Sequence, residues 1–233
     1  MENTTTVFSL IELFKLGGIF MWPLLVFSVA ATAVIIDRAA FLLYHKLRID
    51  RLAPKVLDCV EKGTVGEAAA YLEGITGRSM AARVLLFLVR HISLPESRLE
   101  KAVETEAQDC VNSLEAGFNF LTAIGSLAPL TGFLGTVSGM IGAFRSIAEA
   151  SEVNAQIVAN GIYEALITTV FGLIIAIIAM SAHSVLISVV DHFALRTEKA
   201  CSDIITALAL RGRGTRESPP RTGRDEENVS IPD

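Results

Sequence analysis

The sequence predicts an all-α integral membrane protein with three transmembrane helices and long cytoplasmic helical extensions. Three observations support this fold class. The chain of 233 residues is 52% hydrophobic, and its mean hydropathy of +0.51 is too high for an ordinary soluble domain. It contains three long stretches without Asp, Glu, Lys or Arg. Its basic residues are concentrated on one side of these stretches, which indicates an orientation across the membrane.

Each uncharged stretch is long enough to cross a bilayer, because about 20 apolar residues span about 30 Å of hydrocarbon. The first covers residues 16–36 and continues beyond two charged residues as an apolar turn to Tyr44. The second covers residues 116–144, and the third covers residues 165–190. As a helix the second stretch would extend roughly 44 Å, so we expect it to tilt or to protrude on one side.

The basic residues predict the topology. All of them except Lys15 and Arg145 lie in residues 38–115 or in the C-terminal segment. Because cytoplasmic segments carry the excess of Lys and Arg, we expect the N-terminus to be periplasmic and the C-terminus cytoplasmic. The first residues lack the basic region of a signal peptide, so we expect the first span to remain in the mature protein.

The segments outside the three spans differ in composition. Proline and glycine divide the region after the first span into several short helices. The C-terminal end is rich in Arg, Gly, Pro and acidic residues, which predicts a disordered tail. Its basic half could contact anionic lipid headgroups, although a solvated tail is the preferred interpretation. The predicted division is a periplasmic N-terminal segment at 1–15, transmembrane helix 1 at 16–44, a cytoplasmic helical domain at 45–115, transmembrane helix 2 at 116–144, a short periplasmic loop at 145–163, transmembrane helix 3 at 164–190, a cytoplasmic helix at 191–210 and a disordered tail at 211–233.

The second span is unusually rich in small residues. It contains Gly132, Gly135 and Gly139, and the last two have the GxxxG spacing. Glycines at this spacing let helix backbones approach closely in lipid, so tight helix packing is the preferred interpretation. Pro129 removes one backbone hydrogen bond from this helix, and we expect the hydroxyl of Ser126 to satisfy the freed carbonyl group.

The third span carries a stripe of small and polar residues on an otherwise aliphatic surface, which predicts contact with protein or water. Glu164 opens this span, and ionisable groups at membrane depth commonly line cavities or ion paths. An equally weighted alternative is that Glu164 complements the macrodipole in the first turn of the helix. His183 is interpreted as a packing or interfacial residue rather than a proton relay. The stripe consists of Thr169, Gly172, Ala176, Ala179 and His183.

No enzyme site is recognisable in the sequence. It lacks the P-loop, GxSxG and HExxH patterns, and its four histidines have no ligand spacing. We therefore expect no catalytic residues, no metal site and no cofactor. Cys59, Cys110 and Cys201 lack CxxC spacing and lie in segments expected to be cytoplasmic, which predicts reduced, structural thiols. The formal net charge of −5 argues against nucleic-acid binding.

Two motifs dominate the second and third spans. Residues 128–139 read Ala-Pro-Leu-Thr-Gly-Phe-Leu-Gly-Thr-Val-Ser-Gly, and residues 161–172 read Gly-Ile-Tyr-Glu-Ala-Leu-Ile-Thr-Thr-Val-Phe-Gly. Together they resemble the MotA/TolQ/ExbB proton-channel family, and the similarity covers roughly residues 8–205. With its opening Gly-Gly-Ile-Phe-Met-Trp-Pro-Leu-Leu at residues 17–25, its three predicted spans and its outside N-terminus, the chain resembles the ExbB and TolQ branch, and ExbB more than TolQ. The four-span flagellar MotA branch fits less well.

This resemblance implies a pentamer of the chain around two copies of an ExbD/TolR-type partner, whose single transmembrane helix carries a protonatable Asp. Proton flow across the bacterial inner membrane would drive rotation and, through a TonB- or TolA-like transducer, energise outer-membrane transport. Thr136, Thr169 and Glu164 match the family positions that line the ion path, and hydroxyl groups suit that role because they both donate and accept hydrogen bonds. The residues that would shape the pore are Pro129, Gly132, Gly135, Gly139 and Gly172.

The chain departs from the family pattern at two positions in the third span. Ile178 replaces a proline that family members often have, and Ser184 stands near a frequent asparagine. A kink in this span and the subtype of the chain therefore stay open. The alternatives are a TolQ-like subunit for envelope maintenance, a non-conducting membrane scaffold and, third, a flagellar-like stator that binds a rotor through charged residues of segment 45–115. The cargo and the choice between proton and sodium depend on the partner.

Overall fold

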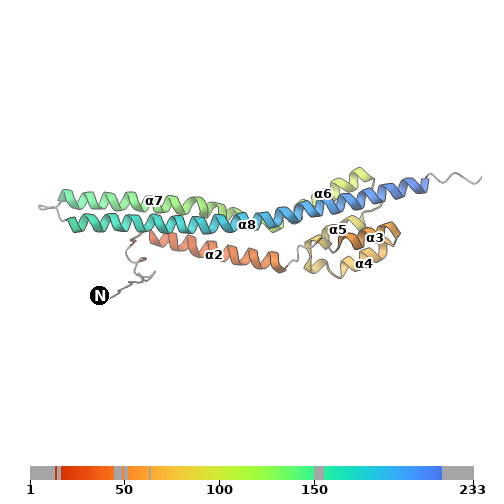
Figure 1. The fold of residues 1–233 in the computed structure, drawn as a ribbon, viewed down its shortest axis with the longest axis horizontal. Helices are drawn as coiled ribbons and strands as arrows, with labels where there is room; N and C mark the ends of the chain where they lie inside the picture. Colours follow the sequence, from red (N-terminus) through yellow and green to blue (C-terminus); the bar gives the residue numbers. More distant parts are fainter. Residues whose placement is uncertain are drawn as a thin grey trace, which may run out of the picture. The chain divides into compact units, whose positions relative to one another are not determined.

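Helices form every regular element in the part of the chain that the computed structural model describes (Figure 1). This confirms the predicted all-α fold. The chain divides into two compact units: unit 1 comprises residues 1–47 and 108–195, and unit 2 comprises residues 48–107 and 196–233. The described residues are 14, 17–44, 49, 52–62, 64–149 and 155–216.

Unit 1 is built from three helices that are long and apolar enough to cross a membrane. Helix α2 spans Met21–Tyr44, α7 spans Phe118–Glu149, and α8 spans Ala155–Arg216, of which the part up to residue 195 belongs to this unit. Helix α2 packs against α7. The unit 1 part of α8 lies beside α7 and runs antiparallel to it (Figure 1).

The helix bounds differ from the sequence expectation at three places. Helix α2 begins five residues after residue 16, because residues 17–20 form a turn in which Gly18 has a φ of +65°. Helix α7 continues to Glu149, and α8 already begins at Ala155, so the expected loop 145–163 is largely helical. An ion pair of 2.8 Å between Arg145 and Glu149, four residues apart, favours this extension of α7.

Helix α8 is one continuous element of 62 residues. It passes the expected division at residue 190 without a break and continues to Arg216, where the sequence predicts a tail from residue 211. The physical reason is local, because no proline or glycine occurs between Gly172 and Gly212. The rest of the expected tail, residues 217–233, and nearly all of the expected N-terminal segment 1–15 lie outside the described residues.

Pro129 lies inside α7, and the helix continues on both sides of it. The expected role of Ser126 is wrong, since its hydroxyl donates to the carbonyl oxygen of Thr122 at 3.1 Å rather than to the carbonyl freed by the proline. A hydroxyl in a helix reaches the carbonyl four residues earlier more readily than its immediate neighbour's.

Unit 2 has its core around α5, which spans Met80–Arg90. Seven residues of this helix are buried, and Ser79 caps its first turn by accepting a hydrogen bond from the backbone N–H of Ala82 at 3.4 Å. The other helices of the unit are α3 at Ala53–Lys62, α4 at Val65–Glu73 and the 3₁₀ turn η2 at Thr76–Arg78. The part of α6, which spans Glu96–Glu115, up to residue 107 and the part of α8 from residue 196 also belong to it.

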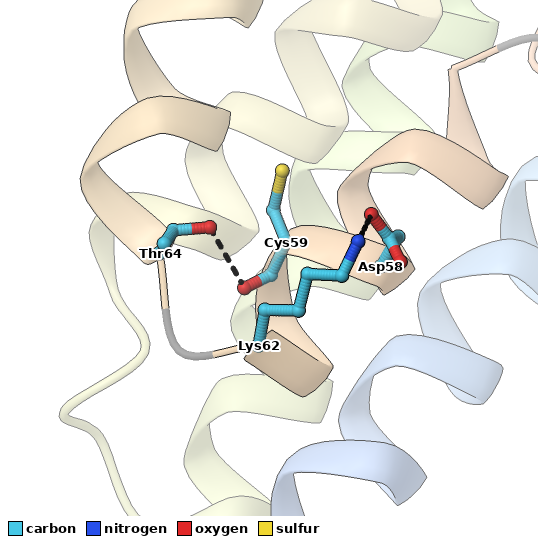
Figure 2. Close-up of polar contacts among 4 residues, drawn as sticks. All are labelled: Asp58, Cys59, Lys62 and Thr64. Carbon is cyan, nitrogen blue, oxygen red and sulfur yellow. Dashed lines mark hydrogen bonds and ion pairs between the residues drawn. The ribbon is translucent and has the colours of Figure 1, made fainter.

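Short-range polar contacts define the corner between α3 and α4 (Figure 2). The ammonium group of Lys62 lies 2.7 Å from Asp58 Oδ2, and this hydrogen bond and the carboxylate charge raise the pKa of Lys62. The hydroxyl of Thr64 donates to the carbonyl oxygen of Cys59 at 3.4 Å. Cys59 is half-buried, whereas Cys110 and Cys201 are buried, and none of these three cysteines forms a disulfide.

Helices α6 and α7 are separated by a turn at Ala116 and Gly117, and Gly117 has a φ of +88°. We expect Gly117→Ala to lower the free energy of unfolding by about 1–2 kcal/mol, because an L-residue is strained in this conformation. The measurement is the unfolding midpoint in detergent by circular dichroism. Gly66→Ala in α4 is the matched control, since its added methyl group meets no atom within 4 Å. A Gly117→Ala midpoint equal to that of the control would contradict the prediction.

Candidate ion-path site

The contact between α7 and α8 is formed by backbone as much as by side chains. A Cβ atom added at Gly132 would lie 2.8 Å from the carbonyl oxygen of Thr168, and one added at Gly172 would lie 2.6 Å from that of Ala128. At Gly139 the added atom would lie 3.1 Å from the carbonyl oxygen of Gly161. These glycines therefore allow the two backbones to approach within a distance that no side chain would permit.

Two threonine hydroxyls of α8 converge on one carbonyl group of α7. The carbonyl oxygen of Gly132 lies 3.2 Å from Thr168 Oγ1 and 3.1 Å from Thr169 Oγ1, and each hydroxyl donates to it. Thr168 is 1% exposed, and its hydroxyl also lies 2.8 Å from the carbonyl oxygen of Ala165. Interhelical hydrogen bonds of this kind contribute about 0.6 kcal/mol on average in membranes, and they fix the register of the two helices.

Thr136 and Thr169 are both half-buried. The Thr136 hydroxyl donates within its own helix to the carbonyl oxygen of Phe133 at 2.6 Å, and Thr169 donates across to Gly132. Both hydroxyl protons are thus engaged, while the oxygen atoms keep lone pairs. At these two positions the oxygens can accept a hydrogen bond from a protonated carboxyl group or from water.

Glu164 is exposed and lies against the turn that precedes α2. A Cβ atom at Gly18 would collide with Glu164 Oε1, so the positive φ and the missing side chain of Gly18 together make room for this carboxylate. Because α8 begins at Ala155, Glu164 lies nine residues inside the helix. The interpretation of Glu164 as a first-turn residue that complements the macrodipole is therefore wrong, since that effect fades beyond the first turn.

Glu164 lines a hollow of about 290 Å³ in unit 1. The buried Thr168 of α8 shares it, as do Ser138 and Ser146 of α7 and the two GxxxG glycines. The hollow therefore combines one carboxylate with hydroxyl groups and exposed backbone, which are groups that hold water. Its lining also includes residues of the turn before α2, so this turn meets α7 and α8 at the hollow.

The structure brings together only part of the predicted set. Gly135 and Gly139 lie in the hollow with Glu164, and Gly132 and Gly172 form the close α7–α8 contact. Thr136 and Thr169 are not among the described residues that line this hollow. Pro129 is half-buried within α7.

Thr168 lines the hollow of Glu164 but was not among the site residues predicted from the sequence. It follows Glu164 by four residues and so lies on the same face of α8, whereas Thr169 is turned away from that face. The four-residue spacing was a signal for it in the sequence.

Comparison with known proteins assigns the chain to a family. Residues 75–199, more than half of the chain, match the model of the MotA/TolQ/ExbB proton channel family. The chain belongs to this family. A biopolymer transport protein ExbB-like 1 of Synechocystis sp. is 34% identical over 79% of this chain and 75% of its own length. The biopolymer transport protein exbB1 of Vibrio cholerae is 28% identical over 76% and 79%, and the Tol-Pal system protein TolQ of Pseudomonas aeruginosa is 44% identical over 30% and 31%.

The family resemblance expected from the two motifs is thus confirmed. With its three apolar helices, this member of the MotA/TolQ/ExbB family is a multi-pass membrane protein with an ExbB/TolQ-like role.

Proposed function

We propose that the chain is the channel-forming subunit of a motor in the bacterial inner membrane that is driven by the proton motive force. Five copies surround two copies of an ExbD/TolR-type partner, and a TonB- or TolA-like transducer passes the work to outer-membrane transport. The N-terminus is periplasmic and the C-terminus cytoplasmic, which is supported by the distribution of Lys and Arg along the chain. The chain itself performs no enzymatic reaction.

The observation that supports this proposal is the set of carboxylate and hydroxyl side chains that α7 and α8 hold within otherwise apolar helices. Glu164 and the nearby hydroxyls of its hollow provide a protonatable entry, and Thr136 and Thr169 keep acceptor lone pairs further along the pair. A carboxylate on a partner helix would accept a proton near Glu164, and the neutral carboxylic acid so formed would donate a hydrogen bond to a threonine oxygen. An ionised side chain at membrane depth otherwise costs several kcal/mol.

The exposed apolar surface of unit 1 supports assembly with further helices. Large side chains of both α7 and α8 are exposed in the single chain, and neither helix buries more than 28% of its most apolar window. Lipid covers part of such a surface, and other protein helices cover the rest. The large exposed side chains near the site include Phe133, Leu134, Val137, Leu166 and Val170.

Native mass spectrometry of the detergent-extracted protein tests the assembly. Five copies of the 25.0 kDa chain, about 125 kDa, are expected alone, with two copies of the single-span partner added after co-expression. A monomer or dimer that does not bind the partner would favour the non-conducting scaffold. That second candidate is supported by the glycine contact of α7 and α8, which packs helices whether or not protons flow.

A flagellar-like stator would bind a rotor through charged residues of segment 45–115. This candidate is disfavoured because two of these charges already have partners within unit 2. Arg83 pairs with Glu106 at 2.7 Å, and Arg90 pairs with Glu73 at 2.7 Å, so these arginines are engaged within unit 2. A TolQ-like subunit differs from an ExbB-like one in the transducer that it serves, and co-purification with a TonB-like or a TolA-like protein separates the two.

A further inference from the structure

A second hollow, of about 270 Å³, lies in unit 1 where α6 ends and α7 begins. It is separate from the hollow of Glu164, and no residue lines both. Side chains from three helices surround it, and two of them are protonatable: Glu115 at the end of α6 and His183 of α8. Asn112 and Asn119 contribute amide groups.

The turn between α6 and α7 forms this hollow. The positive φ of Gly117 interrupts the helix, so that Glu115 before it and Asn119 after it line the same space. The ring of His183 packs edge-on against Phe118, with ring centroids 6.0 Å apart. His183 is half-buried and lines the hollow, and among the residues that the structure describes its ring nitrogens have no hydrogen-bond partner. The nearest charge from α2 is Arg38, which lies beside Gly117 and is paired with Asp37 at 3.0 Å.

The two hollows are separated by the thickness of a membrane. From Glu164 to His183 is nineteen residues along α8, about 29 Å at 1.5 Å per residue. The hydrocarbon core is about 30 Å thick. Helix α8 therefore carries one protonatable, hydroxyl- or amide-lined hollow at each end of its membrane-length segment.

We infer that His183 and Glu115 form the proton-release site at the cytoplasmic end of the path, in place of the packing role that the sequence suggested for His183. This inference rests on the proposed function. Neutral His183 accepts the arriving proton on its free ring nitrogen, and the imidazolium gives a proton to the Glu115 carboxylate or to water in the hollow. Glu115 then loses that proton to the cytoplasm, so both side chains return to their starting states and no other reactant is needed.

The test uses the complex with its single-span partner in liposomes, with proton flux driven by a potassium diffusion potential and followed by a trapped pH-sensitive dye. His183→Gln and Glu115→Gln are each expected to slow the flux about tenfold without changing assembly in native mass spectrometry. A higher concentration of membrane-impermeant buffer on the release side is expected to restore it, because mobile buffer replaces a release group. His192→Gln, at an exposed histidine of α8 whose Nδ1 lies 3.0 Å from the Ser188 carbonyl oxygen, is the matched control and keeps the wild-type flux.

Each outcome decides the matter. Wild-type flux in both variants overturns the release site and leaves the proposed function standing. A slowed flux that buffer does not restore also overturns it, since His183 and Glu115 then act only on packing. A wild-type complex that conducts no protons overturns both proposals.

Discussion

Gly172→Ala is expected to lower the free energy of unfolding by about 1–3 kcal/mol, the usual cost of overpacking a tight contact. The added methyl carbon would lie 2.6 Å from the carbonyl oxygen of Ala128 and 3.3 Å from the Cα atom of Gly132. Both neighbours are backbone atoms of α7, which cannot turn aside as a side chain can. The helices must therefore separate, and the hydrogen bonds from Thr168 and Thr169 to Gly132 lengthen with them. The measurement is the thermal or denaturant midpoint of the detergent-solubilised protein.

Gly142→Ala is the matched control, because it makes the same chemical change in α7 where an added methyl group meets no atom within 4 Å. Alanine favours a helix over glycine, so its midpoint is expected to stay equal or to rise slightly. Gly125→Ala tests whether the kind of atom that the methyl group meets matters. The methyl group there would press on the flexible side chain of Met180 rather than on backbone. Equal midpoints for Gly172→Ala and Gly142→Ala would show that α7 and α8 are not in backbone contact.

Glu164→Gln is expected to reduce partner-dependent proton uptake into liposomes by about two orders of magnitude, within the range for loss of a proton-transfer group. Glutamine keeps the shape of the side chain beside Gly18 but cannot take up a proton at neutral pH. Thr136→Val and Thr169→Val remove the hydroxyl groups with little change in shape, and each is expected to slow uptake at least about tenfold. The rate is read from a trapped pH-sensitive dye, and pentamer formation is checked on the same samples.

Thr131→Val serves as the control for the two threonine variants. Its hydroxyl donates within α7 to the carbonyl oxygen of Leu127 at 2.9 Å, much as Thr136 does to Phe133, and it has no part in the proposed path. Its uptake is expected to equal that of the wild type. Unchanged uptake in Glu164→Gln, Thr136→Val and Thr169→Val would remove the ion path and leave the scaffold.

The three apolar helices were predictable from the sequence because their cause is local. A charged side chain is costly in hydrocarbon wherever it lies, so a membrane-length stretch without charges marks a span without any knowledge of its neighbours. The family was predictable for a similar reason, since its two motifs are continuous in the chain. Helix ends were less predictable, since α7 and α8 extend past the charged residues that end the uncharged stretches. Charged residues such as Arg145 and Glu149 occur in loops, but four residues apart they also form an ion pair on a helix.

Which residues meet was decided by the tertiary structure alone. The glycine spacing predicted a close contact, but the antiparallel register of α7 on α8 determines that Gly132 faces Thr168 and that Gly172 faces Ala128. The same register buries Thr168 beside Glu164. Glu115 and His183 are 68 positions apart in the chain, and only the turn at Gly117 and the packing of α8 place them around one hollow. Local composition determines whether a segment can cross a membrane or form a helix. Contacts between distant segments depend on backbone shape and register, which no single segment encodes.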